Sequence, residues 1–446
     1  MARPNVTFKL NDQSLVGPQS ESISDAKMIG AMLSVDQHSI ALSREGETAE
    51  GVMLVPNIND LYARLSAMIT NFAGGATYMA GITLYSVGSC ASSYLDGTYT
   101  GTAFEGVFTK DVNVNGKTYT YGPYTGGRTA FRQEFWAMNN FLQYGAPLYV
   151  GFGGVTNAAI HGASGFEAIA DFTLFDVIFQ GISSDAGQQN VIKVVEAKKA
   201  QDLPVFGVLY VPSTQFGTEV ITSSGITTFP GSTFDDFHYA TVFGEKVHLG
   251  PNNSTDTLVT TILTPDVAGC IARTDKLYFP WYSPAGLKRG RILNVTKLAR
   301  NLKAGEQDAL YDKGINPVVT FPGEGTFLFG DRTLKGTTST LSRINVGRLF
   351  INLKKTLGTV ARNTLFEVNN AGTRATFVAQ CDKILSRIVS QNGLSEYKIV
   401  CDESNNPISV VEANQFFAEV LIKPLTSINY ITITLTNVDL ETNING

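Results

Sequence analysis

The chain has 446 residues, which is long enough for two or three domains around a sizeable buried core. Hydrophobic residues make up 43% and charged residues 16%, so the composition excludes a disordered protein. No apolar stretch approaches the ~20 residues that cross a bilayer, and the first residues lack the apolar core of a signal peptide, so we expect folding in a cytoplasm and no membrane insertion.

The net charge of −5 is unevenly distributed. Residues 1–268 carry 13 Lys and Arg against 24 Asp and Glu, whereas residues 269–446 carry 21 against 15. Two stretches, 276–305 and 332–366, each hold seven basic residues and no acidic one. Such stretches are typical either of a face that binds a nucleic acid or an acidic protein surface, or of a solvated basic face. The sequence alone leaves both interpretations open.

The first predicted elements are a strand, a helix and an inserted hairpin or loop. Val6, Phe8 and Leu10 alternate with polar residues, which predicts a half-buried strand. Residues 57–75 read as an amphipathic helix that ends at glycine. Ser86–Gly127 is rich in Gly, Thr and Tyr, and we expect an inserted β-hairpin or loop there, as at Ser213–Thr233.

An alternation of helices and strands follows. The sequence predicts a helix over 130–143, strands at 147–152 and 175–182, a helix over 189–202 and a strand at 204–212. This order indicates an α/β layer in the acidic portion of the chain.

The basic portion has its own order. Short strands are expected within 314–334, a basic amphipathic helix over 344–363, a second helix closed by Gly393 and a strand from Tyr397. Residues 428–438 alternate again, with Ile431, Ile433 and Leu435 on one face and Tyr430 beside them. Strands at both ends of the chain either close one sheet within it or act as arms that extend a neighbour's sheet.

Sites for chemistry are not evident. The segment FPGEGTFLFGDRT has glycines at P-loop spacing, but Asp331 and Arg332 follow Gly330 where Lys and Ser/Thr are needed, so we interpret it as structural. Gly151 and Gly153 lack the third glycine of a dinucleotide site. The four histidines have no metal-ligand spacing, and Asp235 and Asp236 beside His238 read as solvated acids. We expect no catalytic, cofactor or metal site and, from four scattered cysteines, no disulfide framework.

Several motifs in the basic portion carry a family resemblance. The segment TPDVAGCIARTDKLYFPWYSPAGLKRGRI, residues 264–292, is followed by GINPVVTFPGEGTFLFGDRTL, INVGRLFINLKKTL, LFEVNNAGTRATF, CDESNNP and VLIKPLTSINYITI. In this order they resemble the tail sheath proteins of contractile-tailed bacteriophages over about residues 264–434. Residues 131–152, FRQEFWAMNNFLQYGAPLYVGF, are similar more weakly. In this family the glycines of FPGEGTFLFGDRT would shape turns around a core strand, and Arg332 would pair with an acid or a neighbouring subunit.

The resemblance implies a structural subunit of stacked hexameric rings around a tail tube, and contraction of that helix drives the tube through the host envelope. The implied fold is a multidomain α+β and α/β protein: an N-terminal arm (1–22), an outer α/β domain with a β-rich insertion near 86–128 (23–263), an inner sheath domain (264–427) and a C-terminal strand arm (428–446). Implied partners are further copies of the chain, the tail tube protein, and baseplate and tail terminator proteins, with no direct contact to nucleic acid. The implied location is the virion tail, assembled in the host bacterial cytoplasm.

Two sets of residues are candidates for these contacts. Inter-subunit pairing is expected at Val6, Phe8, Leu10, Tyr430, Ile431, Ile433 and Leu435. Contact with an acidic tube is expected at Arg343, Arg348, Lys354, Lys355 and Arg362. The alternatives are a sheath from a phage-like bacteriocin or contractile secretion system and a nucleic-acid-binding protein, while an enzyme would lack a complete set of catalytic residues.

Overall fold

The computed structural model describes residues 30–34, 52–55, 110–114, 117–121, 136–146, 148–152, 175–181, 183, 185–213, 235–249, 258–336 and 339–427. The predicted terminal strands lie outside these residues, and with them the arm candidates Val6, Phe8, Leu10, Tyr430, Ile431, Ile433 and Leu435. The predicted helix at 57–75 and nearly all of the excursion at 213–233 also lie outside them.

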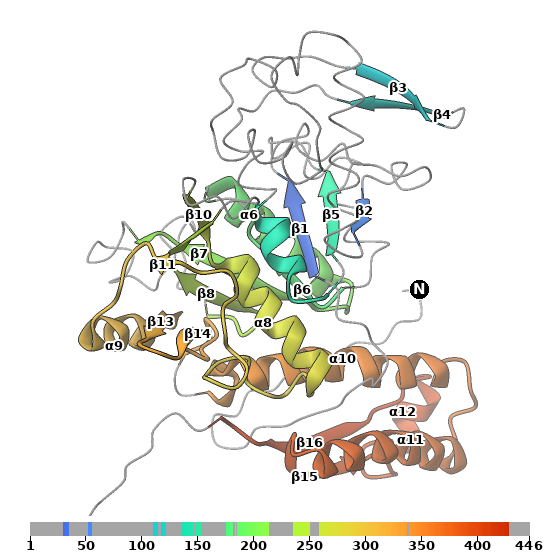
Figure 1. The fold of residues 1–446 in the computed structure, drawn as a ribbon. Coiled ribbons are helices and arrows are strands. Elements are labelled where there is room, and N and C mark those ends of the chain that lie inside the picture. Colours follow the sequence, from blue (N-terminus) through green and yellow to red (C-terminus); the bar gives the residue numbers. More distant parts are fainter. Residues whose placement is uncertain are drawn as a thin grey trace, which may run out of the picture.

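A seven-stranded sheet forms the centre of the fold (Figure 1). Its strands run in the order β12-β8-β7-β6-β1-β5-β2, and every neighbouring pair is parallel except β2 with β5. The strands are β1 (Gly30–Ser34), β2 (Val52–Val55), β5 (Leu148–Phe152), β6 (Val177–Phe179), β7 (Phe206–Val211), β8 (Tyr239–Phe243) and β12 (Ile315–Asn316).

Helices α6 (Asp185–Ala200) and α8 (Thr264–Leu277) both pack against β1, β6 and β7. The whole of β7 is buried, as expected for a parallel strand covered on both faces. The predicted strands at 147–152, 175–182 and 204–212 and the predicted helix at 189–202 are confirmed as β5, β6, β7 and α6. Residues 136–142 are helical, which confirms the described part of the helix predicted over 130–143.

The predicted insertion contains an antiparallel hairpin of β3 (Lys110–Val114) and β4 (Lys117–Tyr121), which projects away from the central sheet (Figure 1). A second, antiparallel sheet has the order β10-β9-β11. Its strands are β9 (Glu245–Leu249), β10 (Leu258–Ile262) and β11 (Lys297–Leu298).

Helix α8 contains the first part of the motif over 264–292, a segment for which we predicted no element. Pro265 lies in its first turn, where the missing N–H costs nothing, and Asp266 follows it. A Cβ on Gly269 would lie 2.2 Å from the Tyr144 ring, so only glycine lets the helix approach that ring. Thr264 Oγ1 donates a hydrogen bond to Gln180 O at 2.7 Å, which ties the helix start to the end of β6.

The short strands predicted within 314–334 are confirmed. After α9 (Ala304–Asp312), β12 joins the central sheet, and β13 (Val318–Phe321) and β14 (Gly325–Leu328) form an antiparallel hairpin. FPGEGTFLFG therefore spans the last residue of β13, the turn and all of β14, which confirms the structural interpretation of this segment.

The last described region combines helices with a two-stranded sheet (Figure 1). A 3₁₀ turn at Thr340–Ser342 leads into α10 (Ile344–Thr364), α11 (Ala371–Ser390) follows, and β15 (Leu394–Val400) pairs antiparallel with β16 (Glu419–Pro424), with α12 (Ile408–Glu412) between the strands. Both predicted helices and the strand from Tyr397 are confirmed. The whole is a mixed α+β fold.

The predicted boundary at 263/264 separates elements that are in contact. Helix α8 and strand β12, which follow it, pack on and pair with strands of the central sheet that precede it. The domain boundary predicted at 263/264 stays a prediction.

Candidate functional site

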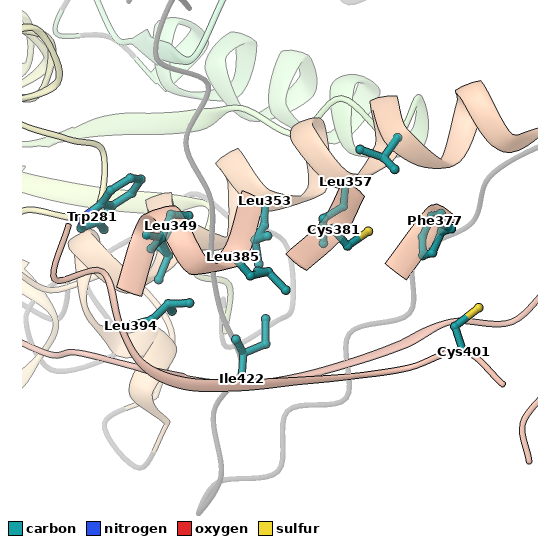
Figure 2. Packing of buried hydrophobic residues seen from close by; sticks show 12 residues of the cluster. Trp281, Leu349, Leu353, Leu357, Phe377, Cys381, Leu385, Leu394, Cys401 and Ile422 are labelled. Carbon is teal, nitrogen blue, oxygen red and sulfur yellow. The ribbon is translucent and has the colours of Figure 1, made fainter. Parts of the chain in front are cut away.

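Helix α10 carries all the predicted tube-facing residues, either in the helix or at its N-cap. Its apolar residues Leu349, Leu353 and Leu357 are buried in one cluster with α11 and with β15 and β16 (Figure 2). The other members are Trp281, Val360, Phe377, Cys381, Leu385, Ile388, Leu394, Cys401 and Ile422. The spacing of three or four residues along α10 places these side chains on one face, and burying each contributes about 1.5–3 kcal/mol.

Gly393 closes α11 in a different way from the expected glycine stop. The residue with the left-handed backbone is Asn392, at φ 58°, while Gly393 N donates to Ile388 O at 2.9 Å. A Cβ on Gly393 would lie 2.3 Å from Ile388 Cγ2 and 3.0 Å from the Trp281 ring. Gly393 is therefore required by close packing against the cluster.

Arg348, also on α10, is not part of this apolar cluster. Its side chain is buried against α8. Its guanidinium donates two hydrogen bonds to the carboxylate of Asp275, and the two side chains are only 4% and 9% exposed. Burial raises the pKa of Asp275, and the charge and hydrogen bonds of Arg348 oppose that rise. Asp275 is the acid of the ARTD motif, so this motif fixes α10 to α8.

Lys354 and Lys355 extend the same attachment to the central sheet. Lys355 Nζ lies 2.6 Å from Asp176 Oδ1 and donates to Phe175 O at 3.0 Å, directly before β6. Lys354 Nζ lies 2.8 Å from Asp202 Oδ1, just after α6. We name the pairs of Arg348, Lys354 and Lys355 the α10 ion pairs. They join α10 to three segments that are distant from it in the sequence: the end of α8, the residue before β6 and the turn after α6.

The two remaining candidates have weaker attachments. Arg343 Nη1 donates to the Tyr311 hydroxyl at 2.6 Å. Arg362 lies near the end of α10 and donates within the helix to Thr359 Oγ1 at 3.1 Å. The structure thus brings three of the five candidates into intrachain ion pairs, and their contact with a tube stays a prediction. Sequence reasoning did not assign these pairings: Asp275 was noted only as part of the ARTD motif, and Asp176 and Asp202 have no signal beyond their negative charge.

The GDRT segment supports the start of α10. Asp331 is buried, and its Oδ2 accepts a hydrogen bond from Ser427 Oγ at 2.7 Å. Burial raises the pKa of Asp331, while hydrogen bonds from Ser427 and Ser283 oppose that rise. Arg332 places its guanidinium 4.7 Å from the Tyr311 ring centroid, so its described contact within the chain is aromatic, and pairing with a neighbouring subunit stays a prediction.

A second buried network lies beneath α8. Lys246 Nζ lies 2.8 Å from Asp266 Oδ1 and donates to Leu293 O at 2.9 Å, and neither charged side chain has exposed surface. The Tyr144 hydroxyl donates to Asp266 at 3.0 Å and accepts from Leu293 N at 3.0 Å. Burial raises the pKa of Asp266 and lowers that of Lys246, and each charge opposes the other's shift. The network pins the loop after α8 to β9.

Asp235 and Asp236 are structural as well. Asp236 Oδ1 lies 2.6 Å from His238 Nδ1, and its Oδ2 lies 2.6 Å from Lys199 Nζ. Asp235 pairs with Lys335 at 2.9 Å. They are therefore paired within the chain, which corrects their interpretation as merely solvated acids.

Among the residues that the structure describes, no three His, Cys, Asp or Glu side chains form a group that could hold a metal ion. None of the described helices combines the length and apolar character that a membrane crossing requires.

Comparison with known families decides how this arrangement is classified. The model for the phage tail sheath protein central domain matches residues 153–334, and the model for the phage tail sheath C-terminal domain matches residues 337–436. The two matches are consecutive and together cover well over half of the chain. The chain belongs to the phage tail sheath family.

Curated relatives agree over a shorter region. Tail sheath proteins of Vibrio phage KVP40 and Enterobacteria phage T4 are 46% and 45% identical to this sheath chain over 171 residues, which is 38% of the chain. The matched region spans 26% of the length of each relative. A tail sheath protein of Salmonella phage ViI is 35% identical over 164 residues.

Solved structures show the same fold over nearly the whole chain. A sheath complex of an extracellular contractile injection system in the contracted state aligns with a TM-score of 0.63 and 13% identity, covering 99% of both chains. The contracted helical sheath of the anti-feeding prophage aligns with a TM-score of 0.60 and 14% identity, covering 98% of this chain and 100% of that one. At such identities the likeness shows the fold alone.

Proposed function

We propose that this chain is the structural subunit of a contractile phage tail sheath. It polymerises as stacked hexameric rings around the tail tube, and contraction of the polymer drives the tube through the host envelope. The observation that carries the proposal is the consecutive match of the central and C-terminal sheath models over residues 153–436. The whole-chain fold likeness to contracted sheaths supports it.

The C-terminal region supports polymerisation by strand exchange. Strands β15 and β16 form a two-stranded sheet, and in the described residues neither outer edge has a further strand. An unpaired edge is a template for another strand, and its backbone hydrogen bonds supply affinity. The segments Val6–Leu10 and Ile428–Val438, which the sequence predicts to be strands, would suit such an edge. Head-to-tail contacts of this type generate helical polymers.

The attachment of α10 supports motion of the subunit as one body. The α10 ion pairs connect the C-terminal helices to α8 and to the central sheet, so force on the arms is transmitted to the central domain. We keep the division into arms at 1–22 and 428–446, an outer domain at 23–263 and an inner domain at 264–427 as a proposal.

The partners proposed are further copies of the chain, the tail tube protein, and the baseplate and tail terminator proteins, with assembly in the host cytoplasm. Charge reversal of Lys354 or Lys355 would also break ion pairs with Asp202 or Asp176. Arg362, whose described contact is a hydrogen bond within its own helix, is therefore the cleaner residue for testing tube contact at α10. The curated relatives matched here are phage proteins, so we place the chain in a phage tail and not in a bacteriocin or secretion sheath.

Electron microscopy of the purified chain tests the proposal. We expect the full chain to form long hollow striated tubes, either alone or after addition of its tube protein. A chain lacking Thr434–Gly446 should fold but remain in small particles, because it lacks an arm. Absence of polymers from the full chain under both conditions contradicts the sheath function, whereas tubes of normal length from the truncated chain contradict only the arm.

A further inference from the structure

The buried pair of Lys246 and Asp266 places an amine against a carboxyl group. Lys246 lies in β9 and Asp266 in the first turn of α8, 20 positions further along the chain. Lys246 Nζ is 2.8 Å from Asp266 Oδ1, and both side chains have 0% exposed surface. The carboxyl carbon Cγ is one bond of about 1.2 Å from that oxygen, so Nζ lies within about 4 Å of Cγ. At this separation a small shift brings the two atoms to the distance at which a bond forms.

Burial favours the neutral forms of both groups, which are the forms that react with each other. Water does not reach the pair, and a buried charge without water tends to gain or lose its proton. Burial lowers the pKa of Lys246 and raises the pKa of Asp266, and in each case the partner's charge opposes the shift. A neutral amine is a nucleophile and an ammonium is not, while a carboxyl group that keeps its proton can release its hydroxyl as water.

Tyr144 and Leu293 orient the two groups. The Tyr144 hydroxyl donates to Asp266 Oδ1 at 3.0 Å, which draws electron density away from Cγ. Leu293 O accepts a hydrogen bond from Lys246 Nζ at 2.9 Å, and Leu293 N donates to the Tyr144 hydroxyl at 3.0 Å. Within the described part of the chain, Asp266 Oδ2 has no hydrogen-bond partner. Oδ1 is thus the polarised carbonyl oxygen, and Oδ2 is the oxygen that carries the proton of the acid.

We propose that Lys246 and Asp266 form an intramolecular amide bond, which cross-links β9 to α8. Nζ attacks Cγ and the C–N bond forms, the bond between Cγ and Oδ2 breaks, and one proton of the amine joins the Oδ2 hydroxyl, which leaves as one water molecule. The step needs no oxidant, reductant or cofactor, because an amine and a carboxylic acid give an amide and water. Holding the groups in place supplies an effective concentration of about 10⁵–10⁸ M, which offsets the unfavourable equilibrium of this condensation between free molecules in water. The product also removes the cost of burying an ion pair.

The bond joins two layers of the fold. Strand β9 is the middle strand of the sheet β10-β9-β11, and α8 packs against β1, β6 and β7 of the central sheet. A covalent tie between β9 and α8 therefore limits how far the second sheet can separate from the central one. The cross-link is a property of the folded subunit and does not depend on the proposed sheath function.

Mass spectrometry of the full chain tests the cross-link and needs no variant. We expect the intact mass of the purified, folded chain to lie below the mass of its sequence by one water molecule. Tandem spectra of a tryptic digest should show a branched peptide in which Lys246 is joined to Asp266. Trypsin should not cleave after Lys246, because its amine is then part of an amide.

The chain contains its own control for the role of burial. Lys354 Nζ and Asp202 Oδ1 are also 2.8 Å apart, but their side chains are 24% and 26% exposed. Water keeps this second pair ionised, so we expect no branched peptide between Lys354 and Asp202. Tyr144→Phe removes the hydroxyl that polarises Cγ, and it should slow cross-linking in the freshly translated chain about 100-fold. Circular dichroism verifies that this variant folds, and a rate equal to that of the wild type contradicts the role of Tyr144.

Three outcomes count against the inference. A folded wild-type chain that keeps the full mass of its sequence after prolonged incubation overturns it and leaves Lys246 and Asp266 as an ion pair. A loss of water that the tandem spectra place elsewhere, such as an aspartate cyclised to a succinimide, overturns it as well. Equal cross-linking at Lys354 and Asp202 contradicts the argument from burial. None of these results bears on polymerisation, so the proposed sheath function stands or falls separately.

Discussion

Replacing Arg348 by methionine removes the guanidinium that faces Asp275 beneath α10, while keeping most of the side-chain volume. The two side chains are 4% and 9% exposed, so the carboxylate left behind is shielded from water. An uncompensated buried charge of this kind typically costs about 3–5 kcal/mol. Since α10 is joined to α8 through this pair, we expect loss of stability and a weaker connection between the C-terminal helices and the central sheet.

Urea unfolding followed by fluorescence measures this loss. The two tryptophans of the chain, Trp136 and Trp281, are 1% and 3% exposed, so their emission changes when the packing around them, including the cluster under α10, is lost. With a denaturant slope of roughly 3 kcal/mol per M, the expected loss lowers the urea midpoint by about 1–2 M. Lys354→Met is the matched control. Its pair with Asp202 is about a quarter exposed on each side, so the loss should stay below about 1 kcal/mol.

A double variant separates the charge from the packing. Arg348→Met combined with Asp275→Leu removes both charges and leaves an apolar contact, which is often neutral relative to the ion pair. We expect this double variant to recover most of the midpoint lost in Arg348→Met. If the double variant is as unstable as the sum of the two single variants, the loss does not come from an unpaired carboxylate and the reasoning is wrong.

Two further predictions concern packing and pH. Gly393→Ala should destabilise the chain by about 1–3 kcal/mol in urea unfolding, because its Cβ would lie 2.3 Å from Ile388 Cγ2. Gly305→Ala in α9, with no atom within 4 Å of the added Cβ, should be neutral or slightly stabilising, and equal losses at both positions would contradict the packing argument. Burial alone would raise the pKa of Asp236, but the hydrogen bond and charge of His238 outweigh it and hold that pKa well below its usual value. The carboxylate's stabilisation is therefore complete above about pH 4 and is lost as the pH falls toward the folded-state pKa, so Asp236→Asn should cost about 2 kcal/mol at pH 7 and less at pH 3. A loss that is the same at both pH values would refute this ionic origin.

Local sequence patterns were sufficient for most elements of the fold. The apolar spacing of residues 344–363 predicted α10 and its buried face, and the β-branched runs around residues 175–182 and 204–212 predicted β6 and β7. These signals are local, since helix and strand periods are set by neighbours within a few residues. Helix α8 was not predicted, although Pro265 and Asp266 are helix-start signals.

Contacts between distant segments were beyond the sequence. The basic character of residues 332–366 was evident, but not that Arg348, Lys354 and Lys355 meet acids 73, 152 and 179 positions earlier in the chain. Exposed and neutralised lysines look alike in a sequence, because their pairing depends on which surfaces the tertiary fold brings together. Only the folded arrangement separated the paired basic residues of α10 from the exposed ones between α8 and α9.

The sequence by itself determined the class of the chain: an α+β protein with sheath-like motifs in a fixed order and an acidic portion followed by a basic one. The tertiary structure decided what those motifs do. It showed that Asp275 holds α10, that the glycines of FPGEGTFLFGDRT lie in and around a β-hairpin and that Gly269 admits the Tyr144 ring. The physical reason is that composition and period are properties of neighbouring residues, whereas burial and charge pairing are properties of surfaces that meet only after the chain has folded.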